Sequence, residues 1–252
     1  MLTKQQIQEL AEYYKIDGFT IVREYLQLVF LNYLYQHKKA DKIYFKGGTA
    51  IRLLFGSQRF SEDLDFAVTY SQQEIKEILK KVEKNIQKEL GKVKIALLYK
   101  GQKSIRFRLK YIQENYKYPF AIRLDFSREE IARKAVSSPL VSKFPIIFFP
   151  LISHFSAKEI LAEKIRSLMM RGKGRDLYDI WFLLQKKIDI DESLVKIKLK
   201  KTGINYQPAV LQQKIKRFPL QKLERDLGKF LPEPQRKIIK RLKELDIDNK
   251  KL

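Results

Sequence analysis

Two short segments constrain the fold of this chain most: a diglycine turn and, shortly after it, a pair of aspartates two residues apart. The first is Lys46-Gly47-Gly48-Thr49, which leads into a helical pattern, and the second is Asp63-Leu64-Asp65 at the start of an apolar run. Glycine lets the backbone approach a bound group closely, and a helix that begins there points free N–H groups at an anion. Aspartates two residues apart on a strand project from the same face. The two segments therefore predict a strand, a turn, a helix and a second strand that meet around one site.

The chemistry of this pattern is that of a phosphate site beside a metal site. Carboxylate oxygens are hard ligands, and two of them near a phosphate-binding turn are typical of Mg²⁺ (or Mn²⁺) holding a nucleoside triphosphate. We therefore predict nucleotidyl transfer, with Asp63 and Asp65 as metal ligands. Gly47, Gly48 and Thr49 are predicted to bind the nucleotide through backbone N–H groups and the threonine hydroxyl. An isolated Asp-x-Asp is often only a solvated pair at a strand end, but the nearby glycine turn favours the metal site.

Two further residues are candidates for the same site. Asp125, in the apolar run Ile122–Phe126, is the candidate third carboxylate, which would deprotonate the attacking hydroxyl or bridge a second metal ion. The alternative is a surface aspartate before a turn. Arg52 lies one helical turn after Thr49 and is a candidate for neutralising triphosphate charge, and its alternative is an ordinary exposed helix arginine.

The charge balance indicates the kind of partner. The chain has 252 residues, with 52 Lys and Arg against 29 Asp and Glu, which leaves a formal net charge of +23. Such a surplus repels itself and favours a polyanion, either nucleic acid or an anionic membrane. A lysine-rich proteome is the alternative source of the surplus. With 44% hydrophobic residues, the chain can bury the core of one large domain or two small ones.

Residues that are rare or absent exclude several classes of site. The chain has no cysteine, which excludes disulfides and thiolate metal sites, and its two histidines disfavour a histidine-built zinc site. The N-terminus carries no early apolar core typical of a signal peptide. The most apolar helical pattern, Phe19 to Tyr35, is interrupted by charged and polar residues. We therefore expect a cytoplasmic protein with no membrane partner.

The hydrophobic periodicity predicts an α+β N-terminal domain over residues 1–150 and a helical C-terminal domain over 151–252 that completes the active site. Strand 105–111 alternates strictly, so Arg106, Arg108 and Lys110 would form a basic outer face. Helices are predicted over 3–14, 19–37, 49–55, 71–90, 157–171, 176–186, 190–200, 208–216, 219–229 and 234–246, and strands over 43–45, 64–68, 93–99, 105–111, 120–126 and within 144–155.

A second group of charged residues lies in the C-terminal part. Ser156-Ala157-Lys158-Glu159 predicts a helix start, and Lys164 then falls on the apolar side of that helix, where a lysine is costly. Asp176 falls on the mainly apolar side of the next helix. A pair between Lys164 and Asp176 would explain both, either as a structural ion pair or by placing the lysine on the triphosphate. A snorkelling lysine and a helix-capping aspartate are the alternatives.

Four segments together resemble a known family. They are Lys46–Arg52, Arg59–Phe66, Leu161–Ile165 and Arg175–Asp179. In this order they are similar to the AbiEii/AbiGii toxin family of nucleotidyltransferase-like proteins, the toxin half of type IV abortive-infection and related toxin–antitoxin pairs. The chain has Gly48-Thr49 where the wider superfamily more often has Gly-Ser, and threonine keeps the hydroxyl.

The resemblance implies a DNA polymerase β-like nucleotidyltransferase fold: a mixed sheet with flanking helices and a helical C-terminal region. It implies catalytic roles for Asp63, Asp65, Lys164 and Asp176, and triphosphate binding by Gly48, Thr49 and Lys164. It also implies a cognate antitoxin and, as acceptor, an RNA such as the tRNA 3′ end. Two alternatives are nucleotidylation of a protein hydroxyl and a non-catalytic module that binds GTP or RNA. We expect the RNA backbone to contact Arg106, Arg108, Lys110, Arg171, Lys173 and Arg175.

Overall fold

The computed structural model describes residues 1–112, 119–129, 133, 135–146 and 150–247. The chain divides into two compact units. The first contains Met1–Gly56 and Phe60–Phe155, and the second contains Ser57–Arg59 and Ser156–Leu252. Separate domains over 1–150 and 151–252 stay a prediction.

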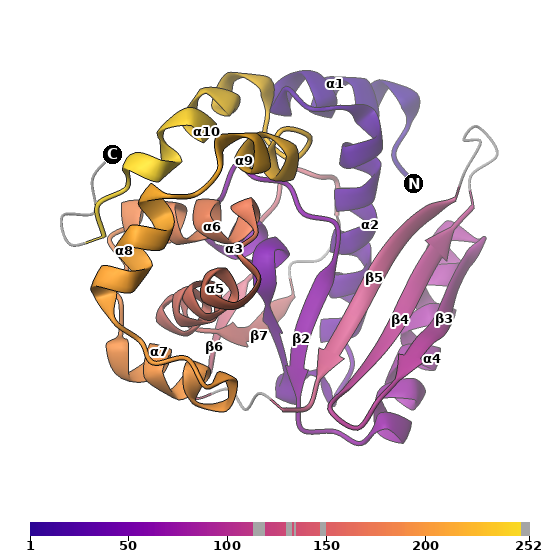
Figure 1. The fold of residues 1–252 in the computed structure, drawn as a ribbon. Coiled ribbons are helices and arrows are strands. Elements are labelled where there is room, and N and C mark those ends of the chain that lie inside the picture. The colour runs from indigo at the N-terminus through magenta and orange to yellow at the C-terminus, as the bar shows by residue number, and fades with distance from the viewer. Residues whose placement is uncertain (113–118, 130–132, 134, 147–149, 248–252) are drawn as a thin grey trace. The chain divides into compact units, whose positions relative to one another are not determined.

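The first unit is built on one mixed sheet (Figure 1). Across the described residues this sheet has seven strands in the order β3-β4-β5-β2-β1-β7-β6. The strands are β1 (Ile43–Lys46), β2 (Leu64–Val68), β3 (Val93–Lys100), β4 (Ser104–Tyr111), β5 (Phe120–Ser127), β6 (Ala135–Pro139) and β7 (Leu151–Phe155). The central strand β2 runs antiparallel to β1 and parallel to β5, so segments far apart in sequence become neighbours.

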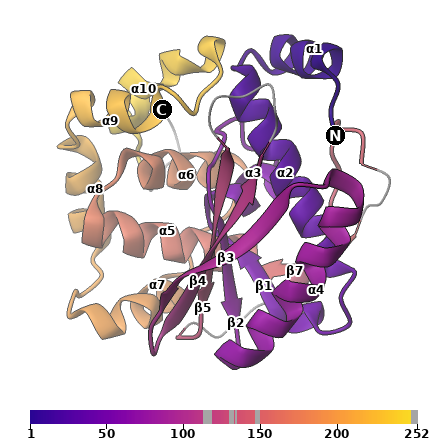
Figure 2. The same cartoon turned by 90° about the vertical axis from the view of Figure 1, so that its right-hand side faces the viewer.

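The helices of the first unit are α1 (Lys4–Tyr14), α2 (Gly18–Tyr35), α3 (Gly47–Phe55) and α4 (Gln72–Leu90). Helix α1 packs on α2, and α3 packs on the strands β1 and β2. The long helices α2 and α4 pack on each other, and they also pack on β5 and β3 respectively (Figure 2). The side chains of Thr3 and Ser71 cap α1 and α4 through complete capping boxes.

An aromatic row determines which way the central strands face. Phe45, Phe66 and Phe126 are directly opposite one another on β1, β2 and β5 and are fully buried. The Phe66 ring stacks on Phe126, and Phe30 of α2 contacts it from the helix layer. Because side chains alternate along a strand, the residues just before these phenylalanines must project from the opposite face of the sheet.

The second unit is helical in its described part. Its α-helices are α5 (Ala157–Arg171), α6 (Gly174–Gln185), α7 (Glu192–Leu199), α8 (Pro208–Lys216), α9 (Leu220–Leu227) and the short α10 (Ile238–Arg241). The segment predicted as one helix over 234–246 is instead α10 flanked by 3₁₀ turns. Among the helices of residues that the structure describes, none combines the length and the apolar character that crossing a membrane requires.

Two boundaries in the first unit differ from the sequence prediction. Helix α3 begins at Gly47, not at Thr49, so both glycines belong to its first turn. Strand β6 was not predicted, because its residues are mostly exposed and show no apolar alternation. In the segment 144–155 the strand covers Leu151–Phe155, whereas 147–149 lie outside the described residues.

Candidate active site on the central strands

One transverse row of the sheet brings together three of the predicted site residues, Asp65, Asp125 and Arg106. Register pairs Lys46 of β1 with Asp65 of β2, Asp65 with Asp125 of β5, and Asp125 with Arg106 of β4. Neighbouring strands lie about 4.8 Å apart, and residues opposite one another share a face. Asp65 and Asp125 therefore stand side by side on the face that points away from the aromatic row. The sequence predicted both residues, with Asp125 on a strand next to that of Asp65, but it did not predict the register that places them directly opposite each other.

Asp63 lies just before β2, two residues before Asp65, and its partner on β5 is Arg123, two residues before Asp125. Its carboxylate accepts a hydrogen bond from the Arg123 guanidinium of β5. In the same way Arg106 Nε donates to Asp125 Oδ2 at 2.6 Å. These two ion pairs are partly exposed: the arginine side chains are 49% and 45% accessible. Asp63 and Asp125 are thus held by cations from the same sheet face.

The donor set fits a divalent metal ion, although the side chains are not gathered around one. Asp63, Asp65 and Asp125 offer carboxylate oxygens, the ligand type that Mg²⁺ prefers. Among the residues that the structure describes, however, no group of three His, Cys, Asp or Glu side chains is close enough to hold a metal ion. The arginine pairs of Asp63 and Asp125 account for this, because each carboxylate is turned to its own guanidinium. Metal binding by the three aspartates stays a prediction.

Gly47 is required where it stands. Its φ is +82°, a left-handed conformation that favours glycine, and a Cβ added there would overlap Oδ2 of Asp65. The first turn of α3 therefore lies directly against the Asp65 carboxylate. The side chain of Lys46, the residue at the N-cap position, does not cap this helix. A phosphate bound there would lie close to a carboxylate, and a cation between the two would relieve their repulsion.

The Thr49 side chain has a positioning contact of its own. Its hydroxyl donates to the main-chain carbonyl of Asp63, which ties the start of α3 to the segment before β2. A hydroxyl has one proton to donate, so a phosphate could receive it only if this bond broke. Phosphate binding by the backbone at Gly48 and Thr49 stays a prediction.

Arg52 lies in a buried ion pair. Its guanidinium binds the Glu24 carboxylate of α2, with Nη2 3.0 Å from Oε1, and stacks 3.4 Å above the Phe60 ring. Burial raises the pKa of Glu24, and the Arg52 charge opposes that effect. This setting favours a structural role for Arg52, and its predicted contact with the triphosphate stays a prediction.

In the second unit, Lys164 lies between two aspartates of α6. Its Nζ is 2.8 Å from Asp179 and 3.6 Å from Asp176. Lys164 and Asp176 do lie close together, but the nearer partner, Asp179, was missed. Its spacing from Asp176 was the available signal, since residues three apart share a helix face. Arg171 completes the cluster with two 2.9 Å hydrogen bonds to Asp176.

Arg59 is a second residue that the sequence reasoning missed. It lies in the segment Ser57–Arg59, which belongs to the second unit, and its side chain is 2% exposed. Both of its hydrogen bonds to Asp179 are 2.9 Å long. Burial alone raises the pKa of Asp179, but the charges of Arg59 and Lys164 outweigh burial and lower it. Along the chain, Asp63 follows Arg59 by four residues.

The predicted RNA-binding residues are divided between the two units. Arg106, Arg108 and Lys110 project from the exposed face of β4, as predicted. In the second unit, Lys173 precedes α6, and the Arg175 guanidinium lies 5.0 Å from the Phe230 ring. Arg171 is committed to Asp176, as described above. RNA binding by these residues stays a prediction.

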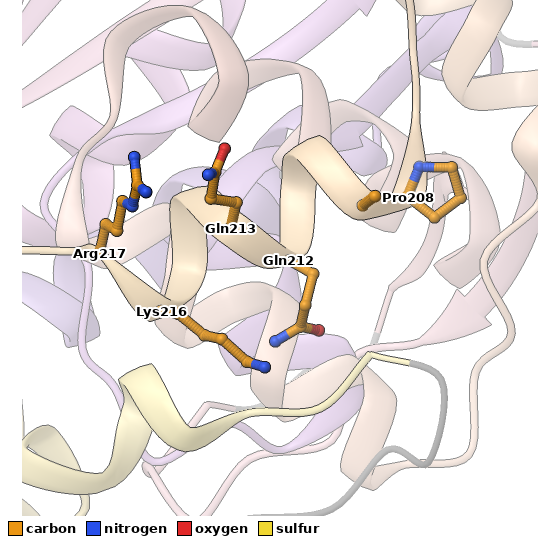
Figure 3. Close-up of a pocket in the computed structure, with 6 residues that line it drawn as sticks. Pro208, Gln212, Gln213, Lys216 and Arg217 are labelled. Carbon is orange, nitrogen blue, oxygen red and sulfur yellow. The ribbon is translucent and has the colours of Figure 1, made fainter.

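A cavity of about 710 Å³ lies along α8 in the second unit (Figure 3). Its described lining is Pro208, Ala209, Gln212, Gln213, Lys216 and Arg217. These residues all come from one helix and the residue after it, and none of them carries a carboxylate. The cavity therefore offers no metal ligands of the kind found on β2 and β5.

Comparison with known families gives a match over most of the chain. The model of the family described as "Nucleotidyl transferase AbiEii toxin, Type IV TA system" matches residues 29–249. No curated protein matches the sequence.

Solved structures share the fold at low sequence identity. MenT4, a nucleotidyltransferase toxin from Mycobacterium tuberculosis, is 20% identical with a TM-score of 0.62, and the match covers 98% of this chain and 92% of that one. JHP933 from Helicobacter pylori is 18% identical with a TM-score of 0.55, covering 93% and 94%. A putative nucleotidyltransferase from H. pylori is also 18% identical, with a TM-score of 0.56 and coverage of 91% and 95%. The predicted fold class, a mixed sheet with flanking helices and a helical C-terminal region, is confirmed.

Proposed function

Because this chain belongs to the AbiEii family of nucleotidyl transferase toxins from type IV toxin–antitoxin systems, we propose that it transfers a nucleoside monophosphate from a nucleoside triphosphate to an RNA acceptor. The proposed acceptor is the 3′ hydroxyl of a tRNA or a similar RNA. Family membership also implies an antitoxin as a partner. The proposed place of action is the cytoplasm.

The observation that carries the proposal is the pair Asp65 and Asp125, opposite each other beside the glycine turn that begins α3. Two carboxylates on one sheet face repel each other, which costs stability unless a cation joins them. Backbone N–H groups within reach of the same face suit a triphosphate. Carboxylates and an anion-binding turn at one place are what transfer of a nucleotide requires.

In the proposed reaction, the RNA hydroxyl oxygen attacks the α-phosphorus, a new P–O bond forms and pyrophosphate leaves with the old one. Asp125 takes the hydroxyl proton. Asp63 and Asp65, with Asp125, would hold Mg²⁺, which supplies charge neutralisation for the triphosphate. The N–H groups of Gly48 and Thr49 orient the phosphates. Catalytic roles for Lys164 and Asp176, which the family resemblance implies, are part of the proposal.

The experiment is transfer of label from each α-labelled NTP to total tRNA in the presence of Mg²⁺, followed on a denaturing gel. Asp63→Asn, Asp65→Asn and Asp125→Asn should each abolish the label. Asp41→Asn removes the same charge from an exposed turn of the same unit and should transfer normally. Lys164→Met and Asp176→Asn are assayed in parallel, to test whether these two residues of the second unit are also needed for transfer. Unchanged transfer by the three site variants would contradict the proposal.

The same gel separates the two alternative functions. Label on protein in a lysate, with none on RNA, would indicate a protein hydroxyl as acceptor. If no label appears anywhere but a labelled NTP still binds, the chain is a binding module. The net charge of +23 favours the RNA acceptor, since a protein acceptor has no comparable phosphate charge.

A further inference from the structure

The face of β3, β4 and β5 that α2 and α4 leave uncovered is strongly basic. We define the basic face by Lys94 on β3, Arg106, Arg108 and Lys110 on β4, and Arg123 on β5, all of which are exposed. Register places Lys94 directly opposite Lys110, and Arg108 directly opposite Arg123. The charges therefore form two adjacent like-charged pairs, not a scattered distribution.

Such an arrangement is unfavourable for the folded chain alone. Like charges directly opposite on neighbouring strands are destabilising, and the chain already carries a net charge of +23. Within the described residues, no carboxylate forms an ion pair with Lys94, Arg108 or Lys110. Arg123 is already paired with Asp63, and a bound polyanion would remove the remaining repulsion by neutralising Lys94, Lys110 and Arg108. The basic face thus favours a ligand with regularly spaced negative charges.

An aromatic ring stands at the end of the basic face. Tyr99 of β3 is 51% exposed and lies opposite Arg106, whose guanidinium is 5.5 Å from the ring centre. The ring packs over Gly101, where a Cβ would overlap it, so the missing side chain makes room for it. Exposed rings on a sheet face stack on unpaired bases, and a base inside a duplex cannot reach them.

The order of the rows gives the basic face a direction. Three successive rows of side chains follow one another along β4 on this face. The first holds Lys94 and Lys110, the second Arg108 and Arg123, and the third Tyr99, Arg106 and Asp125. That last row continues into Asp65. A single nucleic-acid strand bound along this face would therefore have one of its ends at the carboxylates of Asp125 and Asp65.

We propose that the basic face, with Tyr99, binds the single-stranded 3′ end of the RNA acceptor and delivers it to Asp65 and Asp125. Lys94, Arg108 and Lys110 contact phosphates, and Tyr99 stacks on a base. This inference rests on the proposed function, because the carboxylates that end the face are those proposed to act on the terminal hydroxyl.

The test measures RNA binding by the full-length chain without NTP or metal, using fluorescence anisotropy of a labelled single-stranded RNA oligonucleotide at several salt concentrations. Lys94→Gln/Lys110→Gln should weaken RNA binding at least tenfold. It should also reduce the salt slope, which is the slope of the logarithm of the binding constant against the logarithm of the salt concentration, by about 1.4 in magnitude, since two phosphate contacts are lost. The matched control, Lys80→Gln/Lys84→Gln, removes two exposed lysines from α4 of the same unit and should bind within twofold of the wild type.

Tyr99 provides a test that does not depend on charge. Tyr99→Leu should weaken binding about tenfold with an unchanged salt slope, whereas Tyr99→Phe should bind normally because the ring remains. Thermal unfolding checks that every variant folds, and these exposed substitutions should leave stability nearly unchanged.

The inference would be overturned if the wild type did not bind the RNA oligonucleotide, or if the lysine variant and its control lost RNA affinity equally. It would also be overturned if blunt duplex RNA bound as tightly as the single strand, or if poly-glutamate of the same charge competed as well as the RNA itself. The last result would indicate an acidic protein as the ligand. Because binding is measured without transfer, the two proposals fail separately. Binding through the basic face without label transfer contradicts only the function, and transfer with normal binding by the variants contradicts only the inference.

Discussion

Asp65 and Asp125 lie directly opposite each other on the parallel strands β2 and β5, one residue before the stacked pair Phe66 and Phe126. The stack is buried in the core, so the register that aligns the rings also aligns the carboxylates. Two acids at neighbouring positions cost stability. The fold tolerates this cost at the place where a metal ion and a triphosphate are proposed to bind.

Replacing the two aspartates should separate stability from activity. Asp65→Asn/Asp125→Asn removes the repulsion between the carboxylates and also the partly exposed Arg106–Asp125 ion pair, so we expect a melting temperature close to that of the wild type. Label transfer should fall at least a hundredfold, because the proposed metal ligands and base are gone. Asp41→Asn serves as the control in both assays. A large loss of stability in the double variant would show that the carboxylates are structural.

The two left-handed glycines at the ends of α3, Gly47 at its start and Gly56 just after its last residue, offer a matched comparison. Gly47→Ala adds strain at φ +82° and a methyl group that overlaps the Asp65 carboxylate, whereas Gly56→Ala adds strain at φ +78° with nothing within 4 Å. We expect Gly56→Ala to lose about 1 kcal/mol in denaturant unfolding and to stay active. Gly47→Ala should lose more stability and most of its transfer activity. Equal behaviour of the two variants would mean that the contact with Asp65 is unimportant.

Arg123 should compete with a metal ion for Asp63. In Arg123→Gln the Asp63 carboxylate loses its guanidinium partner. We expect Mn²⁺, titrated by calorimetry without nucleotide, to bind about two- to fivefold more tightly, which corresponds to the strength of an exposed ion pair. Arg108→Gln removes an equal charge from the opposite position on β4 and should change Mn²⁺ affinity less. Weaker Mn²⁺ binding in Arg123→Gln would contradict competition.

A compensated pair decides between the two roles of Arg52. Arg52→Met alone leaves the Glu24 carboxylate buried without its partner and should cost about 3–5 kcal/mol of unfolding free energy. Glu24→Leu/Arg52→Met removes both charges and should recover most of that loss. If Arg52 is only structural, the double variant also recovers label transfer, with a KM for NTP close to that of the wild type. A stable double variant with a strongly raised KM for NTP would instead assign Arg52 to the triphosphate.

The Asp179 cluster should make stability depend on acidity. The Arg59 and Lys164 charges outweigh burial and hold the pKa of Asp179 below its ordinary value. A lowered pKa in the folded state means that the stabilisation is present above the unfolded pKa, and it is lost as the pH falls below about 4. Asp179→Asn should therefore be about 3–5 kcal/mol less stable than the wild type at pH 7.

Thermal unfolding from pH 7 to pH 3 measures that difference. The gap between Asp179→Asn and the wild type should narrow below about pH 4, because the unfolded wild-type chain then binds a proton at Asp179 that the folded chain binds only at a lower pH. Glu192→Gln, which breaks an exposed pair with Lys196 in the same unit, should show little effect at any pH. A gap that stays constant down to pH 3 would contradict the role of the charged carboxylate.

Local signals predicted much of the secondary structure. The helix start at Ser156, the alternation over Ile105 to Tyr111 and the strand that follows Asp63 all appear in the structure as the residues indicated. Each of these signals acts within a few residues, through a helix cap or the two-residue period of a strand. The weak pattern of β6 is the counterexample, since exposed polar residues carry little periodicity.

The sequence by itself determined which residues are candidates for the proposed chemistry: a glycine turn, three aspartates and a surplus of cations. Only the tertiary structure decided which of them meet. Asp65 pairs with Asp125 across 60 residues of chain, and Arg59 finds Asp179 across 120. The Lys164 side chain likewise lies nearer to Asp179 than to Asp176. Such partners depend on strand register and helix packing, which arise from buried contacts such as Phe66 on Phe126, and no local pattern encodes them.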